Sequence, residues 1–306
     1  MEQQLDPAAV RAAAARIAGH TRPAAVAPAG PGVWYALEHL QHTGSFKARG
    51  AHNFLAAHAG AGALPAAGVT IASGGNAGLA CAWAARTHGV PATVFLPAAA
   101  PRVKVDRLRG YGADVRLVGE TYAEALDACQ EFAARSGALS SHAYDHPLVA
   151  AGAGTLFEEI RAALPGLDAL VVAVGGGGLF AGLATAAREH GVRILAAEPE
   201  NCRALNAALE AGRVVDVPVA SVAGDSLGAP RVSADALRAA RHPDVESVLV
   251  PDTAITAARR ALWEEHRLVV ENGAATALAA LRTAPAPPGE RVAVVLCGAN
   301  TDPRDL

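Results

Sequence analysis

Two side chains in this sequence could supply a neutral primary amine, Lys47 and Lys104, because every other residue among its 26 lysines and arginines is an arginine. An arginine keeps its proton in a protein, whereas a lysine can lose its proton and act as a nucleophile or a base. Lys47 opens an Ala-rich helical segment, where the helix dipole disfavours a cation and would lower the pKa of a buried amine. Considered alone, both lysines are expected at the solvated surface, and the strongly charged segment around Lys104 favours this interpretation for that residue.

Four consecutive glycines, residues 175–178, separate a buried-strand pattern from a helical pattern. Their backbone N–H groups could converge on a phosphate, with the positive end of the helix behind them. A tight turn would need one glycine, or two at most, so this glycine loop favours the phosphate. Gly176, Gly178 and Ala181 also approximate a dinucleotide-binding fingerprint, with Glu198 about twenty residues on. A nicotinamide-dependent oxidoreductase is therefore the alternative from another enzyme class.

A second loop after a strand pattern, residues 73–77, combines small and polar residues before a helical pattern. Its backbone N–H groups, the Ser73 hydroxyl and the Asn76 amide suit a carboxylate ligand. An ordinary helix N-cap formed by Ser73 or Asn76 explains the same residues equally well. We call this segment the carboxylate loop.

Short apolar runs alternate with longer Ala-rich helical patterns along most of the chain, which is typical of a parallel α/β fold. The expected strands are residues 69–73, 92–96, 113–118, 169–174, 193–198, 246–250 and 291–296. The expected helices are residues 76–88, 102–110, 121–135, 148–163 and 178–190, after an N-terminal helix capped by Asp6. Continuously apolar strands indicate helices on both faces of each sheet. We predict a large domain of residues 1–67 and 146–306 and a small domain of residues 68–145.

The composition argues against several classes of function. The net charge is −3 with acidic and basic residues interleaved, so neither a nucleic-acid surface nor a membrane-surface helix is expected. No apolar run reaches the roughly 18 residues that a membrane span needs, and the acidic N-terminus does not resemble a signal peptide. The four cysteines include no CxxC pair, which argues against a zinc site and a disulfide framework. We expect a cytoplasmic protein that acts on a small molecule.

Four motifs occur in a defined order: SFKARGA (45–51), ASGGNAG (72–78), VGGGGLFAG (174–182) and LCGAN (296–300). In this order and at these separations they resemble the fold-type II pyridoxal-phosphate enzymes. Within that superfamily they are most similar to the serine/threonine dehydratase and serine racemase group. The resemblance covers essentially the whole chain. It implies an α/β fold of the tryptophan synthase β type, with two parallel-sheet α/β/α domains.

The resemblance also implies a role for each matching residue. Lys47 would carry pyridoxal 5'-phosphate as a Schiff base and act as the catalytic base, and Phe46 would pack on one face of the pyridine ring. Asn76 would hydrogen-bond the ring hydroxyl, and Cys297 would lie beside the ring nitrogen. The cofactor phosphate would be cradled by Gly175, Gly176, Gly177, Gly178 and Leu179. The substrate carboxylate would be bound by Ser73, Gly74, Gly75, Asn76 and Ala77.

The implied reaction is β-elimination, the dehydration and deamination of a small hydroxy-amino acid, L-threonine or L-serine, to a 2-oxo acid and ammonium. A neutral thiol at Cys297 would not hold the ring nitrogen protonated, and such a moderate electron sink suits elimination. Racemases of the group carry a second serine where this chain has Gly74, so racemisation is expected to be a minor activity. Racemisation and β-replacement on serine-like substrates are kept as alternatives. The resemblance also implies a homodimer.

Other departures from the family concern ions and turns. The family's divalent-cation site pairs a glutamate with an aspartate six residues later, whereas this chain has Glu198 and Ala204. No metal site is therefore predicted, although a monovalent cation near Glu198, bound mostly by carbonyls, remains an open alternative. The EPxGA turn reads ENGAA here, and Glu271 is expected to line the site. Asp225 and Ser226 are expected near the substrate.

The remaining candidates receive structural interpretations. His42, His142 and His146 flank loops, but isolated histidines are usually structural or solvated, so no role is assigned to them. Cys81, Cys129 and Cys202 lie on helical patterns and are expected to be small core residues. Because no regulatory domain follows the CGANTD segment, control by isoleucine is not expected.

Overall fold

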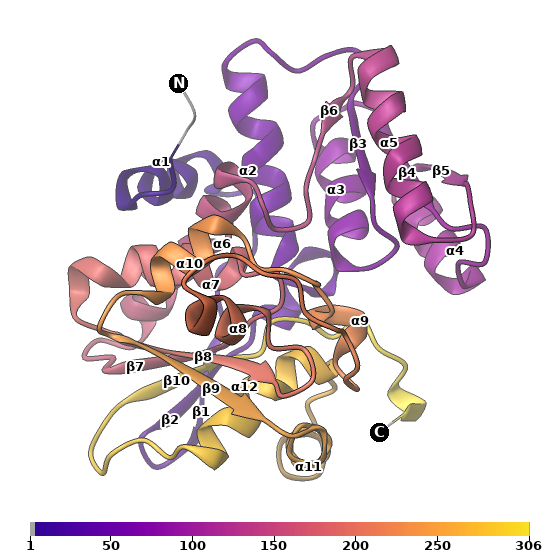
Figure 1. The fold of residues 1–306 in the computed structure, drawn as a ribbon. Helices are drawn as coiled ribbons and strands as arrows, with labels where there is room; N and C mark the ends of the chain where they lie inside the picture. The colour runs from indigo at the N-terminus through magenta and orange to yellow at the C-terminus, as the bar shows by residue number, and fades with distance from the viewer. Residues whose placement is uncertain (1–3, 306) are drawn as a thin grey trace.

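The structure, a computed structural model, describes residues 4–305, and its strands form two separate sheets (Figure 1). The large sheet has the order β1-β2-β10-β7-β8-β9, with β1 (Val26–Gly30), β2 (Val33–Ala36), β7 (Ala169–Ala173), β8 (Arg193–Pro199), β9 (Val245–Val250) and β10 (Val292–Val295). The small sheet has the order β5-β4-β3-β6, with β3 (Val69–Ala72), β4 (Ala92–Leu96), β5 (Asp114–Leu117) and β6 (Leu139–Ser140). All neighbouring strands are parallel except β1 and β2. The predicted α/β fold with two parallel sheets is confirmed.

Three strands were not predicted from the sequence: β1, β2 and β6. β1 is an edge strand with an intermediate-to-exposed burial pattern, and it contains Pro28, which is tolerated at a sheet edge. β6 has only two residues. β2 has four residues and pairs with β10, so its place in the sheet depends on a partner more than 250 residues away. β1 and β6 show no long apolar run, whereas the apolar run at β2 was overlooked.

Helices lie between and around the two sheets (Figure 1). They are α1 (Pro7–Ile17), α2 (Lys47–Gly60), α3 (Asn76–Thr87), α4 (Arg102–Gly110), α5 (Tyr122–Ser136), α6 (Pro147–Ala163), α7 (Gly178–Ala187), α8 (Ala204–Ala211), α9 (Gly224–Leu227), α10 (Ala234–Ala240), α11 (Asp252–His266) and α12 (Asn272–Thr283). Short 3-10 turns occupy η1 (Glu38–Leu40), η2 (His42–Gly44), η3 (Arg188–His190) and η4 (Pro303–Asp305). The predicted cap of α1 is confirmed, since the Asp6 carboxylate accepts a hydrogen bond of 2.7 Å from Ala9 N.

Each sheet has its own hydrophobic core, and α2 joins the core of the small sheet. The larger cluster surrounds β7, β8 and β10, and the second surrounds β3, β4 and α3. Phe54 and Leu55 of α2 belong to the second cluster, although α2 also packs on α6. The predicted domain boundaries stay a prediction, and α2 is the element that bridges the two cores.

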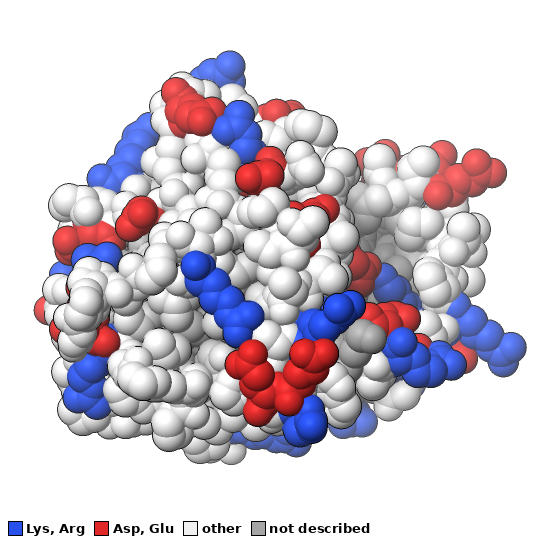
Figure 2. All heavy atoms as spheres, turned by 90° about the horizontal axis from the view of Figure 1, so that it is seen from below, with Lys and Arg blue, Asp and Glu red and all other residues white. Residues whose placement is uncertain are grey.

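The surface carries charges of both signs. On the face shown in Figure 2, acidic and basic side chains are interleaved, with wide uncharged areas between them. Among residues 4–305, no helix is both long enough and apolar enough to span a membrane. The same residues contain no group of three or more His, Cys, Asp and Glu side chains that could hold a metal ion.

Candidate active site

Lys47 lies at the first position of α2, inside the molecule rather than on its surface. Its partly buried amine donates a hydrogen bond of 2.7 Å to Ala143 O and lies 4.7 Å from the centre of the Phe46 ring. Burial lowers the pKa of Lys47 to about 8, while Cys297 and Glu271 act in the opposite direction. The expectation that Lys47, considered alone, lies at the solvated surface is therefore wrong. A lowered pKa suits the role that the motif implies for this amine, which stays a prediction.

The segment before Lys47 forms backbone hydrogen bonds with residues 297–298. Phe46 N donates to Cys297 O at 3.0 Å, and Ser45 forms an antiparallel bridge with Gly298. These contacts bring two predicted motifs, 45–51 and 296–300, into one place. Burial raises the pKa of the Cys297 thiol to about 12, so this side chain is neutral, as its predicted position requires.

A buried ion-pair network holds the first turn of α2, two residues after Lys47. Arg49 is fully buried, and its guanidinium donates to Glu38 and Glu159 at 2.6 Å each. Thr155 accepts a further hydrogen bond of 3.2 Å. Removing one partner of such a network leaves an uncompensated buried charge, which typically costs about 3–5 kcal/mol. The start of α2, and with it Lys47, is therefore tied to η1 and α6.

The carboxylate loop leads into α3, whose N-terminus carries no side-chain cap in the described structure. The interpretation of Ser73 or Asn76 as an ordinary N-cap is therefore wrong, and the free N-terminus suits an anion. Gly75 is the N-cap residue, and a Cβ built on it would meet no atom within 4 Å. A Cβ on Gly74 would lie 2.4 Å from Leu96 Cδ2.

The glycine loop leads into α7, which also begins without a side-chain cap among the described residues. Each of its glycines has a packing reason of its own. Gly177 has a φ of 90°, whereas a Cβ on Gly176 would lie 2.3 Å from the Tyr144 ring and a Cβ on Gly175 would lie 2.9 Å from Leu227 Cα. A Cβ on Gly178 would lie 2.8 Å from Tyr144 O. Only Gly177 therefore serves the turn, as expected, whereas close packing explains the other three glycines, a reason that the sequence reasoning did not consider.

Tyr144 is a site residue that the sequence reasoning missed. Its ring lies on the glycine loop, its hydroxyl donates to Arg231 O at 3.2 Å, and its neighbour Ala143 accepts the hydrogen bond from Lys47. No local pattern marks Tyr144, because its role depends on the return of residues 141–146 past the glycine loop.

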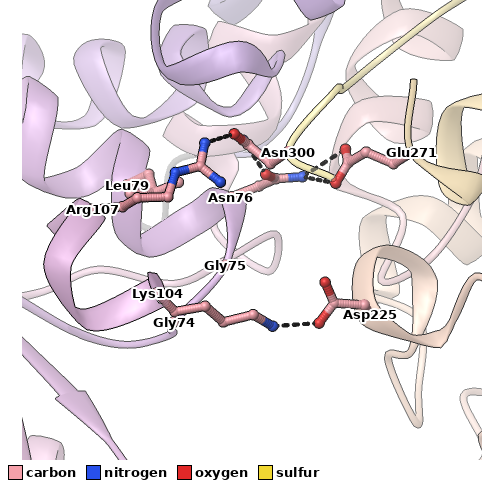
Figure 3. Close-up of a pocket in the computed structure, with 9 residues that line it drawn as sticks. All are labelled: Gly74, Gly75, Asn76, Leu79, Lys104, Arg107, Asp225, Glu271 and Asn300. Carbon is pink, nitrogen blue, oxygen red and sulfur yellow. Dashed lines mark hydrogen bonds and ion pairs between the residues drawn. The ribbon is translucent and has the colours of Figure 1, made fainter. Parts of the chain in front are cut away.

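Polar side chains from four segments meet beside the carboxylate loop (Figure 3). Asn76 Nδ2 donates to both carboxylate oxygens of Glu271, at 2.9 and 3.0 Å. Asn300 Nδ2 donates to Asn76 Oδ1 at 2.6 Å, and Arg107 donates to the Asn300 side-chain oxygen. Asn300 belongs to the LCGAN motif, which was the available signal for it, whereas nothing in the sequence marked Arg107. Whether Asn76 hydrogen-bonds the cofactor, as the resemblance implies, stays a prediction.

Glu271 is buried at the start of α12, as the expectation that it lines the site requires. Burial raises its pKa to about 7, against the hydrogen bond from Asn76 and the charge of Lys47. A Cβ on Gly298 would lie 1.8 Å from Glu271 Oε1, so the glycine of LCGAN leaves room for this carboxylate. Glu271 N also donates to Gly298 O at 3.0 Å.

These side chains line a small pocket. Its lining residues are Gly74, Gly75, Asn76, Leu79, Lys104, Arg107, Asp225, Glu271 and Asn300. Lys104 Nζ donates to Asp225 Oδ1 at 2.6 Å across this pocket (Figure 3). Lys104 lies on the charged helix α4 with its side chain 34% exposed, as predicted, but it also lines the site, which the sequence did not predict. Asp225 lies at the pocket, as expected.

The remaining candidates have structural contacts. The Glu198 oxygens accept hydrogen bonds from Leu205 N and Asn206 N, at 2.7 and 2.8 Å, so this carboxylate caps α8. His142 and His146 accept hydrogen bonds from backbone N–H groups of their own turns. The His42 ring stacks on Trp83 at 4.6 Å. Cys81, Cys129 and Cys202 are buried and free, as expected of core residues.

Comparison with known proteins decides the family. The model of the pyridoxal-phosphate dependent enzymes matches residues 20–298. The chain belongs to this family. A human serine dehydratase-like protein is 40% identical over 288 residues, which cover 89% of this chain and 86% of the human protein. An L-threonine ammonia-lyase of Geobacter sulfurreducens is 39% identical over 279 residues, 90% of this chain and 68% of that enzyme.

Solved structures agree with these relatives. Maize serine racemase superposes with a TM-score of 0.92 at 28% identity, covering 99% of this chain and 96% of the maize chain. This pyridoxal-phosphate dependent enzyme is therefore a member of the serine/threonine dehydratase group, and the predicted cofactor and the predicted ammonia-lyase class are confirmed. The nicotinamide-dependent alternative finds no support in these comparisons.

The described residues fit pyridoxal phosphate. Lys47 offers an amine with a lowered pKa, Cys297 offers a neutral thiol, and the uncapped N-termini of α7 and α3 offer two anion-binding positions. Lys47, Phe46 and Cys297 lie together, and the hydrogen bond to Ala143 links Lys47 to the segment that covers the glycine loop.

Proposed function

We propose that this enzyme removes water and then ammonia from L-threonine or L-serine and releases a 2-oxo acid. The observation that carries the proposal is the position of Lys47, whose amine has a pKa lowered to about 8 and lies in a site where Gly74 offers no second base. The names of the relatives, a serine dehydratase-like protein and an L-threonine ammonia-lyase, support both substrates.

In this proposal Lys47, the carboxylate loop and Cys297 have different roles. The bound cofactor would supply an electron sink for the pair left at the substrate Cα. Lys47 would take the Cα proton at its Nζ, which a pKa near 8 allows close to neutral pH. The N–H groups of the carboxylate loop would orient the substrate carboxylate at the start of α3. The neutral Cys297 thiol would leave the ring nitrogen unprotonated.

The other proposed roles follow the resemblance. Phe46 would pack on the pyridine ring, and Gly175, Gly176, Gly177, Gly178 and Leu179 would hold the phosphate at the start of α7, which has no side-chain cap in the described structure. A monovalent cation near Glu198 stays a prediction, with carbonyl oxygens as its main ligands. We infer a cytoplasmic homodimer, because the free cysteines suit a reducing compartment and two-fold pairs are common.

The experiment that tests this function replaces the base. Lys47→Ala should abolish the visible absorption band of the enzyme–cofactor Schiff base and lower 2-oxo acid release from L-threonine and L-serine by about a thousand-fold or more. Circular dichroism should show that the variant is folded. A band that survives in Lys47→Ala would contradict the proposal, as would a wild-type enzyme that releases no 2-oxo acid from either substrate.

A further inference from the structure

One ion pair joins residues 68–145 to the rest of the chain within the described range 4–305, and it lies at the pocket. Lys104 comes from α4, beside the small sheet, and Asp225 comes from α9, on the other side of the pocket (Figure 3). Their charged atoms are 2.6 Å apart, with side chains 34% and 71% exposed. The other ion pairs of the described residues lie within one of these two parts.

The Lys104 end of the pair lies against the carboxylate loop. A Cβ built on Gly74 would lie 3.8 Å from Lys104 Cδ, an ordinary van der Waals distance. The aliphatic part of Lys104 therefore runs beside Gly74 before the amine crosses to Asp225 (Figure 3). A long lysine stem often covers a neighbouring surface in this way while its head stays at the solvent.

At the Asp225 end, the two residues that follow Asp225 on α9 pack against two other parts of the site. Leu227, two residues after Asp225 on α9, packs against Gly175 of the glycine loop, where a Cβ would lie 2.9 Å from Leu227 Cα. Ser226 Oγ would lie 2.3 Å from a Cβ on Gly273, in the first turn of α12. α9 thus connects the glycine loop with the helix that carries Glu271 at its N-cap.

We propose that the Lys104–Asp225 ion pair is a positioning contact that sets the carboxylate loop at the distance from the glycine loop that amino-acid binding requires. The proposal rests on the proposed function of the two loops. In this proposal, neither Lys104 nor Asp225 contacts the reacting atoms. Breaking the pair therefore weakens the binding of the amino acid, while proton removal by Lys47 continues in the molecules that have bound it.

The expected effect is small for neutral variants because the pair is partly solvated. Exposed ion pairs shift equilibria by up to about five-fold, and salt screens them. Lys104→Met and Asp225→Asn should each raise KM for L-threonine and L-serine by about two- to five-fold, with kcat nearly unchanged. Added salt should raise the KM of the wild-type enzyme toward the values of these variants.

Charge reversal gives the decisive test on the holoenzyme. Lys104→Asp places two carboxylates together and should raise KM by more than Lys104→Met does, by about ten-fold. The exchanged double variant Lys104→Asp with Asp225→Lys restores the pair in the opposite sense and should bring KM back to within about two-fold of wild type. A purely structural role of either side chain would not be rescued by the exchange.

A matched control removes another ion pair near the small sheet. Asp114 and Arg116 on β5 lie 3.0 Å apart, so Asp114→Asn should leave KM, kcat and their salt dependence unchanged. The visible cofactor band should persist in all variants. An unchanged KM in Lys104→Asp, or additive losses in the exchanged double variant, would overturn the proposal.

The test separates this inference from the proposed function. If the wild-type enzyme bound the cofactor but released no 2-oxo acid, the proposed function would fail by itself. The inference would then be judged by titrating the cofactor band with L-serine and L-threonine. Lys104→Asp must weaken the response to these amino acids, and the exchanged variant must restore it.

Discussion

The glycine loop and the carboxylate loop have the same local design and different surroundings. Each follows a buried parallel strand and leads into a helix without a side-chain cap among the described residues. In the glycine loop a Cβ on any of the four glycines would lie less than 3 Å from another part of the chain. In the carboxylate loop a Cβ on Gly75 would meet open space, and one on Gly74 would meet the end of a flexible leucine.

The difference indicates that the glycine loop is rigid and that the carboxylate loop can adapt its shape. The glycine loop is enclosed by Tyr144, Leu227 and Ala236, so its shape is set by packing. The carboxylate loop is held by side-chain contacts across the pocket, from Asn76 to Glu271 and, through α4, from Lys104 to Asp225. We expect changes in the first loop to cost stability and cofactor binding, and changes in the second to alter substrate binding and specificity.

The largest expected effect comes from adding one methyl group to each loop. Gly177→Ala forces a side chain onto a backbone with a φ of 90° and places Cβ 2.4 Å from Ala236 Cβ. It should lower the free energy of unfolding by about 4 kcal/mol, from backbone strain and overpacking together. Gly75→Ala meets no atom within 4 Å and should change the free energy of unfolding by less than about 1 kcal/mol. Chemical denaturation of both variants measures the difference.

The same two variants should separate in their ligand binding. Gly177→Ala should lose affinity for pyridoxal phosphate, seen as a weaker visible band at a fixed cofactor concentration. Gly75→Ala should keep the band and show a raised KM for the amino acid. Equal losses of stability in the two variants would show that the loops do not differ as we describe.

A smaller effect concerns the titratable anchor of the carboxylate loop. Burial raises the pKa of Glu271 from 4.5 to about 7. Between pH 4.5 and about pH 7, Glu271 is therefore protonated in the folded protein and ionised in the unfolded chain. Its contribution to stability is present below pH 4.5 and is lost as the pH rises to about 7. Glu271→Gln should therefore gain stability relative to wild type between pH 4.5 and pH 8, by up to about 3 kcal/mol.

Thermal or chemical unfolding at both pH values measures this gain. Glu131→Gln, a change of an exposed carboxylate on α5, is the control and should show no such gain. A constant stability difference between Glu271→Gln and wild type across this pH range would contradict the raised pKa.

The smallest expected effect is a change of specificity. Gly74→Ser places a hydroxyl where the resemblance implies a second base in racemases. The added Cβ would lie 2.4 Å from Leu96 Cδ2, so the Leu96 side chain would have to move. We expect a measurable rise in the formation of D-serine from L-serine, with elimination still the main reaction. Chiral analysis of the products measures the ratio, and Gly74→Ala, which adds the Cβ without the hydroxyl, is the control. A similar D-serine yield from both variants would contradict the role of Gly74.

Much of the fold follows from local patterns. The strands β3, β4, β7 and β10 coincide with mainly apolar runs, because a strand covered on both faces buries its side chains at every position. Lys47, the two loops and Cys297 were marked by motifs, and the glycines were marked because L-residues are excluded from their conformation or from the space beside them. Even so, the glycines served packing against Tyr144 and Leu227, which the sequence reasoning did not foresee.

By itself, the sequence determined the parallel α/β class, the strand-loop-helix units and the motif around Lys47, since these depend on neighbouring residues and their order. The tertiary structure decided that Lys47 lies inside the molecule and that Lys104 reaches Asp225. Lys104 and Asp225 are 121 residues apart, and Asn76 and Glu271 are 195 apart. Such contacts arise only when segments far apart in the sequence fold together around the pocket, and burial lowers the pKa of Lys47 and raises that of Glu271.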